Sequence, residues 1–129
     1  MKKKLFFMCI IGLLSLASAY AKCDGGTEVT NRVGTTFCRS NKEMNWWSAA
    51  IWCKANGRTL ATMYEMCPSW DGNIGEGRCS ELNGIGNYIV WSATVSGSER
   101  SFSVFLSNGR VYNDDNYGNR TTSRYAFCR

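Results

Sequence analysis

The run Trp46-Trp47-Ser48-Ala49-Ala50-Ile51-Trp52-Cys53 places three tryptophans and a cysteine within eight residues. It belongs to a pattern over residues 43–56 in which apolar residues return every three or four positions, and this spacing predicts an amphipathic helix. The predicted buried stripe consists of Met44, Trp47, Ile51 and Ala55, widened by Trp46, Ala50 and Cys53. Ser40 or Asn41 is a suitable N-cap, and Gly57 suits the left-handed position just past the end.

Two β-rich stretches precede this helix. They are Glu28-Val29-Thr30 and Thr36-Phe37-Cys38, with Gly34 between them. This order of strand and turn residues predicts a β-hairpin within residues 24–39, with Cys23 and Cys38 at its ends.

A shorter helix, which follows the long one in the sequence, is predicted to begin at Thr62. Thr62-Met63-Tyr64-Glu65 fits a capping box, in which hydroxyl and carboxylate satisfy each other's backbone donors. Pro68 limits this helix, and residues 69–87 are glycine-rich and irregular.

Strand-forming residues dominate the rest of the chain. The predicted strands cover residues 88–93, 101–106, 110–112 and 125–128. Asn108-Gly109 predicts a two-residue hairpin between the second and third of them. The fold class expected from all these segments is α+β, with one long helix, one short helix and small antiparallel sheets.

The first residues have the pattern of a secretory signal peptide. Lys2 to Lys4 precede an apolar run over residues 5–16 that is too short to cross a bilayer, and small residues follow it. Cleavage motifs end at Ala19 and at Ala21, and the second is preferred. We therefore expect a signal peptide over residues 1–21 and a single domain over residues 22–129. No lipobox precedes Cys23, so we expect a secreted, periplasmic or cell-surface bacterial protein that does not span a membrane.

Cleavage also changes the charge of the protein. The formal net charge of the whole chain is +5, and removal of three lysines lowers it to +2. The remaining basic residues are scattered along the sequence, without the stripe that a nucleic-acid-binding surface needs. We expect no nucleic-acid partner.

Six cysteines remain after cleavage: Cys23, Cys38, Cys53, Cys67, Cys79 and Cys128. An even number in an oxidising compartment predicts three disulfides, and six cysteines allow fifteen pairings. Zinc is the less favoured alternative, because the chain has neither a C-x-x-C pair nor a histidine.

The helix signature from Trp46 to Cys53, followed by Gly57 and Leu60-Ala61, resembles that of the C-type lectin-like domains. Trp91-Ser92-Ala93-Thr94 and the terminal Tyr125-Ala126-Phe127-Cys128 are similar to the core strand and the closing strand of that family. The resemblance implies a C-type lectin-like fold in which Cys53 pairs with Cys128. It also implies a bridge between Cys23 and Cys38, as in longer members, which leaves Cys67 with Cys79.

The resemblance does not extend to the calcium-dependent sugar motifs. Calcium-binding members carry Glu-Pro-Asn or Gln-Pro-Asp, followed by Trp-Asn-Asp, and this chain has neither; its only proline is Pro68. Asn113-Asp114-Asp115-Asn116 offers oxygen ligands of the kind calcium accepts, but such a run is more often a solvated turn. We therefore expect no metal and no cofactor.

The segment between the last two strands, residues 113–123, has almost no apolar residue and follows Tyr112 directly. A polar loop held on a rigid sheet is a common place for binding, although a solvated hairpin tip is the alternative. The candidate ligand-binding residues are Tyr112, Asn113, Asp114, Asp115, Asn116, Tyr117, Asn119 and Arg120, joined by Trp70. The composition of residues 112–119 also resembles the variable region of C-type lectin-fold proteins diversified by retroelements, which predicts a neighbouring reverse transcriptase gene and a near-copy template.

The residue types in the chain exclude several common kinds of catalytic site. The absence of histidine excludes Ser-His-Asp and Cys-His sites. A carboxylate glycosidase using Glu65, Asp71 and Glu76 is the catalytic alternative, but surface carboxylates and a helix cap explain these residues more simply. Trp70 is either an exposed platform for a ligand or a plug in the core.

These observations predict a non-catalytic binding module. Its expected ligand is a protein or a glycan on a cell surface. A structural or adhesive role in a cell-surface assembly is a further alternative.

Overall fold

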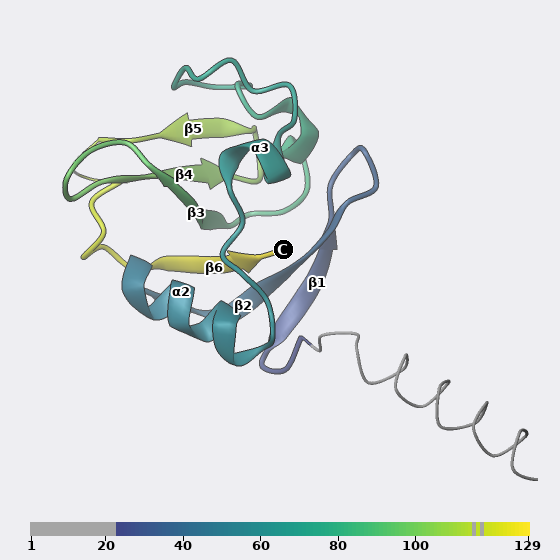
Figure 1. Ribbon diagram of the computed structural model, residues 1–129. Coiled ribbons are helices and arrows are strands. Elements are labelled where there is room, and N and C mark those ends of the chain that lie inside the picture. Colours follow the sequence, from purple (N-terminus) through teal and green to yellow (C-terminus); the bar gives the residue numbers. More distant parts are fainter. Residues whose placement is uncertain (1–22, 115, 117) are drawn as a thin grey trace, which may run out of the picture.

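A computed structural model describes residues 23–114, 116 and 118–129 of the chain; the predicted signal peptide lies outside these residues (Figure 1). The helices are α2 (Trp46–Ala55) and α3 (Met63–Met66), with a 3₁₀ turn, η1, at Ser80–Leu82. The strands are β1 (Gly26–Thr30), β2 (Thr36–Met44), β3 (Ile89–Val95), β4 (Ser101–Phe105), β5 (Arg110–Tyr112) and β6 (Arg124–Cys128). The α+β class is confirmed.

The strands form a single mixed sheet in the order β1-β2-β6-β3-β4-β5. Neighbouring strands are antiparallel except β3 and β6, which pair in parallel where Val90 lies opposite Tyr125. The expectation of several small antiparallel sheets is therefore wrong. The last strand of the sequence inserts into the middle of the sheet and joins the N-terminal hairpin to the β3–β5 meander.

Three disulfides tie this sheet to its surroundings. Cys53 of α2 pairs with Cys128 of β6, Cys23 pairs with Cys38, and Cys67 pairs with Cys79. This is the pairing that the resemblance implied. The first of these bonds spans 75 residues and joins the helix to the closing strand.

The start of α2 differs from the sequence prediction. β2 continues to Met44, because Glu43 and Met44 pair with Tyr125 and Arg124 of β6. Neither Ser40 nor Asn41 caps the helix; the N-cap is Asn45, whose side chain accepts a hydrogen bond from the Ser48 amide at 2.9 Å. The predicted end holds, with Gly57 at a φ of 69° just past the C-cap.

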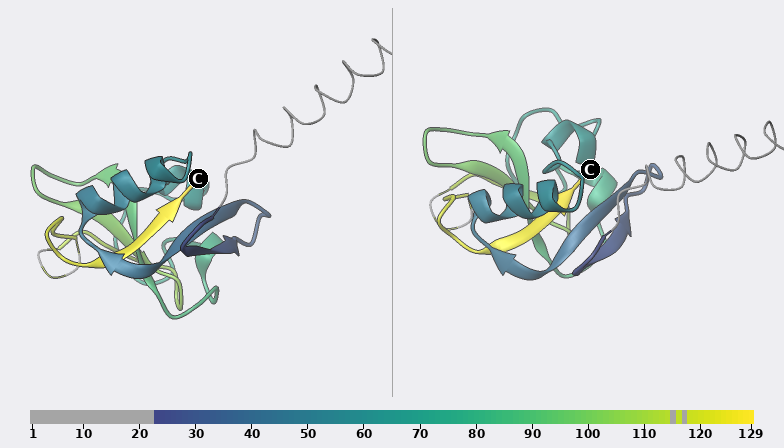
Figure 2. Two further views of the ribbon diagram at one scale, coloured as in Figure 1. Left: turned by 90° about the horizontal axis from the view of Figure 1, so that it is seen from below. Right: turned by 60° about the horizontal axis from the view of Figure 1, so that its bottom comes forward.

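The buried face of α2 is also rotated from the prediction. Ala49 and Cys53 are fully buried, whereas Trp47 is 46% exposed and Ile51 is 69% exposed. The bond from Cys53 to Cys128 holds the helix with Cys53 toward the sheet, and the small Ala49, one turn earlier, lets the helix approach β6 closely (Figure 2). The row of Trp47 and Ile51 therefore faces away from the core.

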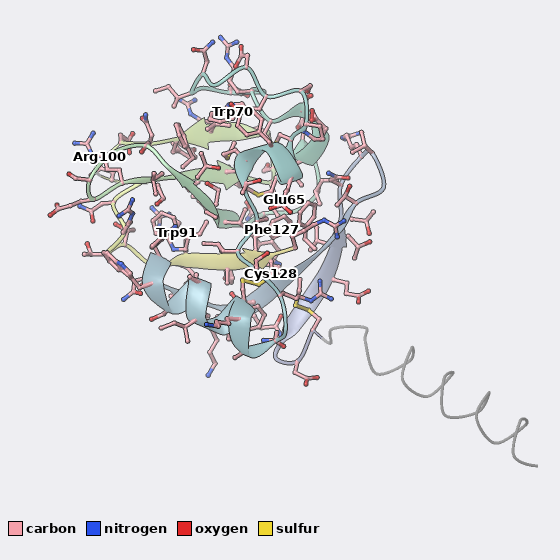
Figure 3. The ribbon with its side chains drawn as sticks, viewed as in Figure 1. Glu65, Trp70, Trp91, Arg100, Phe127 and Cys128 are labelled. Carbon is pink, nitrogen blue, oxygen red and sulfur yellow. A yellow bond between two sulfur atoms is a disulfide. The ribbon has the colours of Figure 1, made fainter. Side chains whose placement is uncertain are left out.

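The sheet has an apolar cluster on each face. Along β6, Ala126 and Cys128 join the cluster under α2, while Phe127 joins the other, as the alternation of side chains along a strand requires. Trp91 is fully buried under α2 and donates from its indole nitrogen to the carbonyl of Met44 at 3.0 Å (Figure 3). On the opposite face, Phe37 and Phe127 stack with ring centroids 4.7 Å apart.

The predicted capping box of α3 is confirmed, but the predicted two-residue turn is wrong. Thr62 accepts from the Glu65 amide, and the Glu65 carboxylate accepts from the Thr62 amide. Between β4 and β5, Phe105 pairs with Arg110, so the loop contains four residues, 106–109. Leu106, the first residue of this loop, is buried, and its amide donates to the carbonyl of Tyr88.

Candidate functional site

Two polar loops meet at one edge of the molecule, on the left of Figure 1. One connects β3 to β4 and has Arg100 at its outer end (Figure 3); the other connects β5 to β6. Arg100 and Asn119 form an isolated antiparallel bridge, and the Arg120 amide donates to the carbonyl of Glu99 at 3.0 Å. We call residues 96–100 together with the described residues of 113–121 the loop surface.

Arg120 holds the two loops together. Its Nε donates to Ser101 Oγ at 3.0 Å, Nη1 donates to the Ser98 carbonyl, and Nη2 donates to the carbonyls of Gly97 and Arg100. A guanidinium has five donors in a rigid plane, so three bonds to the β3–β4 loop and one to Ser101, the first residue of β4, fix the position of that loop. The donors of Arg120 are thus engaged within the protein, and its contact with a ligand stays a prediction.

The same arginine connects the loop surface to the helix. Its guanidinium carbon lies 4.6 Å from the ring centroid of Trp46, and the Trp46 amide donates to the Arg120 carbonyl at 3.0 Å. The ring of Trp46 in turn meets that of Trp47 edge to face, with centroids 6.0 Å apart. The exposed Trp47 thus lies beside the loop surface, and it was not predicted to be exposed.

A small pocket opens within the loop surface. It has a volume of about 230 Å³ and is lined by residues 96–100 and Asn119. The hydroxyl of Ser96 is buried here and has no hydrogen-bond partner in the described part of the chain. A buried, unsatisfied hydroxyl in a polar pocket is a group that a ligand or a water molecule can satisfy. Sequence reasoning missed this pocket, although Ser96-Gly97-Ser98 between two predicted strands is typical of a turn.

The other predicted binding residues of the C-terminal loop lie as follows. Tyr112 and Asn113 are half-buried, Asp114 and Asn116 are exposed, and Asp115 and Tyr117 lie outside the described residues. Asn119 is half-buried and accepts hydrogen bonds from the amide and hydroxyl of Thr121, so it stabilises a turn. The structure brings these described residues together along one loop.

Gly118 was missed by sequence reasoning. It is buried, and a Cβ atom on it would lie 2.7 Å from the backbone carbon of Asn113. Its carbonyl accepts from the Ser101 amide at 2.9 Å. A side chain at this position would therefore push the two ends of the loop apart.

Trp70 lies apart from the loop surface and is a core plug rather than a platform. It is only 7% exposed, and its indole nitrogen donates to the Asn73 carbonyl at 2.9 Å. Its ring packs against those of Tyr64 and Phe102, with centroids 5.3 Å and 4.8 Å away (Figure 3). This burial supports the alternative that Trp70 is a plug in the core and lends no support to Trp70 as a binding residue.

Of the three carboxylates considered for catalysis, Glu65 has a structural role and Asp71 has a lowered pKa. Glu65 caps α3. Hydrogen bonds from the amide and side chain of Asn73, and the charge of Arg78 at 3.0 Å, lower the pKa of Asp71 below its ordinary value. A glycosidase acid needs a raised pKa, so Asp71 is unsuited to donate a proton.

Glu81 is a buried carboxylate that sequence reasoning missed. It accepts from the hydroxyl of Ser69 at 2.6 Å, from the Ser69 amide at 3.1 Å and from the hydroxyl of Ser80 at 2.7 Å. Burial raises the pKa of Glu81, but these hydrogen bonds lower it more, so it lies below the ordinary value. Their effect is to hold the loop before η1, not to prepare an acid.

Two features are absent from the described residues. No group of three or more His, Cys, Asp or Glu side chains is arranged to hold a metal ion there. Among the same residues, no helix has the length and apolar character needed to cross a membrane.

Comparison with known proteins gave no relative. No family model matches the chain, and no match was found among the curated proteins or among the solved structures.

Proposed function

We propose that this protein is an exported, non-catalytic binding module with a C-type lectin-like fold, whose loop surface binds a protein or a glycan on a cell surface. The fold proposal is supported by the helix signature around Trp46 and by the three disulfides, above all the one that joins α2 to the closing strand. The proposed route does not use the calcium motif of the family, because the residues of that motif are missing.

The binding proposal rests on one observation, the set of contacts that the Arg120 side chain makes. Four hydrogen bonds and the contact with Trp46 join two polar loops to a helix that is itself bonded to the sheet. Rigid display of polar groups lowers the entropy that a loop loses on binding. The polar pocket adds a hollow, and the exposed Trp47, whose ring contacts that of Trp46, adds an aromatic face of the kind that recognises sugars and proteins.

A triple variant tests the loop surface without disturbing its frame. Ser98→Ala, Glu99→Ala and Asn116→Ala remove exposed side chains, while the backbone carbonyls that accept from Arg120 and Arg124 remain. The control triple is Ser107→Ala, Glu76→Ala and Asn87→Ala, which removes the same three residue types from exposed positions elsewhere.

The readouts are a glycan array, with calcium and then with a chelator, and co-purification from bacterial envelopes. We expect the native protein and the control triple to retain the same glycan or envelope protein and the loop triple to lose it, with all three melting at the same temperature. Equal retention by the loop triple would refute the site. Release of reducing sugar from peptidoglycan or another polysaccharide would refute the non-catalytic assignment.

A further inference from the structure

A buried arginine lies at the opposite end of the sheet from the loop surface, where β1 and β2 are found (Figure 1). Arg39 of β2 is 6% exposed, and its guanidinium carbon lies 3.7 Å from the ring centroid of Tyr88 and 5.4 Å from that of Tyr125. Nη1 donates to the Ser40 carbonyl at 3.0 Å, whereas Nε is buried without a partner. Within the described residues, Arg39 makes no other side-chain hydrogen bond and no ion pair.

This arrangement is unusual because the charge is not compensated. A buried cation normally has an anionic partner, since removing it from water costs several kcal/mol. Contact with the face of Tyr88 replaces only part of the favourable interaction energy that the guanidinium would have with water. The edge of the guanidinium formed by Nε and Nη2 has no acceptor, and this edge matches a carboxylate with two parallel bonds.

A pocket of about 460 Å³ opens beside this arginine. Its lining comes from β1, from Arg39, from the segment that leads into β3 and from Leu106 after β4. Its apolar side chains are Val29, Ile85, Tyr88 and Leu106. A pocket of this size, with apolar walls and one charged group, fits a small organic molecule.

The strand register places the acidic residue of this pocket away from the arginine. Thr27 pairs with Arg39 and Glu28 pairs with Cys38, so Thr27 shares the face of Arg39 while the side chain of Glu28 points to the other face. Glu28 lines the pocket from the strand but makes no ion pair with Arg39. No carboxylate of the described residues thus competes for the free edge of the guanidinium.

We propose that this pocket binds a small monocarboxylate. The carboxylate accepts hydrogen bonds from the free edge of Arg39, and an apolar or aromatic body lies against Tyr88, Ile85 and Leu106. A single guanidinium matches one carboxylate better than a doubly charged phosphate. This site is separate from the loop surface, and its test is independent of the proposed function.

Titration of the oxidised native protein with three probes tests the ligand chemistry without any mutation. Benzoate provides a carboxylate on an aromatic ring, benzamide has the same shape without the charge, and inorganic phosphate has charge without the apolar body. Calorimetry should show benzoate binding at least about tenfold tighter than either of the others. Absence of benzoate binding, or equal binding of benzamide or phosphate, overturns the proposal.

A matched pair of variants locates the site. Thr27→Glu places a carboxylate opposite Arg39 on the neighbouring strand, within reach of a cross-strand ion pair. Thr27→Gln has nearly the same size and likewise loses the hydrogen bond from Thr27 to Asn41, but it adds no charge. We expect Thr27→Glu to weaken benzoate binding by about tenfold or more and to raise the melting temperature, and Thr27→Gln to keep the affinity within about threefold. Equal affinities for the two variants would show that benzoate does not bind at Arg39.

Discussion

Arg120 shows at the scale of one residue why a polar loop does not imply free side chains. Its four side-chain hydrogen bonds end on the β3–β4 loop and on the first residue of β4, and its guanidinium lies against Trp46. From the sequence it is one of several polar residues in an Asn- and Asp-rich segment, and nothing marks it as the residue that joins two loops.

We expect Arg120→Ala to lower the free energy of unfolding by about 2 kcal/mol, because it leaves several carbonyls and the Ser101 hydroxyl without their donor. Arg120→Lys should recover only part of this loss, since an ammonium cannot reach four acceptors in a fork. Thermal denaturation followed by circular dichroism measures both. An unchanged melting temperature for Arg120→Ala would mean that the hydrogen bonds of Arg120 do not hold the two loops together.

Glu81 affects the stability of the protein at acidic pH. The pKa of Glu81 lies below its ordinary value of 4.5 because of the hydrogen bonds from Ser69 and Ser80, which outweigh the effect of burial. A carboxylate with a lowered pKa stabilises the fold above the unfolded-state pKa, and this stabilisation is lost as the pH falls through the folded-state value.

The native protein should therefore lose stability below about pH 4.5 more steeply than Glu81→Gln, which has no charge to titrate at this position. Urea denaturation at neutral pH and at several acidic values measures the difference. Parallel loss of stability in the two proteins would show that the Glu81 hydrogen bonds do not couple to protonation. Asp71, whose pKa is also lowered, is present in both proteins and does not affect the comparison.

At the scale of elements, the sequence predicts which segments are helix or strand better than it predicts their limits or faces. The capping box of α3 and the left-handed Gly57 after α2 were predicted because local chemistry determines them. The start of α2 was not predicted correctly, because Glu43 and Met44 pair with β6 and thereby belong to β2 instead of the helix. That pairing partner is eighty residues away and leaves no local signal.

The face of α2 could not be predicted for a related reason. Apolar residues occur around most of this helix, so periodicity alone does not distinguish the row of Trp47 and Ile51 from the row of Ala49 and Cys53. The disulfide from Cys53 to Cys128 distinguishes them. In the candidate site, the polar C-terminal loop was predictable from composition, but its contact with the β3–β4 loop depends on the order of strands in the sheet.

Two substitutions test the orientation of α2. Ile51→Gln changes an exposed side chain and should alter the free energy of unfolding by less than about 0.5 kcal/mol. Ala49→Leu adds three carbons to a fully buried position and should destabilise the protein by about 1–3 kcal/mol. Chemical denaturation compares them. The reverse order would indicate that the row predicted from the sequence faces the core.

At the scale of the whole molecule, the closing strand β6 connects the parts. It pairs with β2 on one side and β3 on the other, it carries the cysteine that binds α2, and it begins at Arg124, shortly after the loop surface. The two proposed sites lie at opposite ends of the sheet that β6 completes, which allows a loop ligand and a small carboxylate to bind at the same time (Figures 1 and 2).

The bond between α2 and β6 is the central element of this organisation. A disulfide that spans 75 residues limits the unfolded chain strongly and contributes about 4 kcal/mol in the chain-entropy description. It also fixes the helix that carries Trp46 and Trp47 beside the loop surface. The rigid position of the loop surface therefore depends on the bond between Cys53 and Cys128.

Peptide mapping of the native protein without reduction tests this bond most directly. A lysine or arginine separates every neighbouring pair of the six cysteines, so trypsin places each cysteine in a different peptide. We expect mass spectrometry to find residues 43–54 linked to residues 125–129, together with the Cys23–Cys38 and Cys67–Cys79 pairs. Recovery of Cys128 as a free thiol, or linked to any peptide other than the one that contains Cys53, would contradict the account.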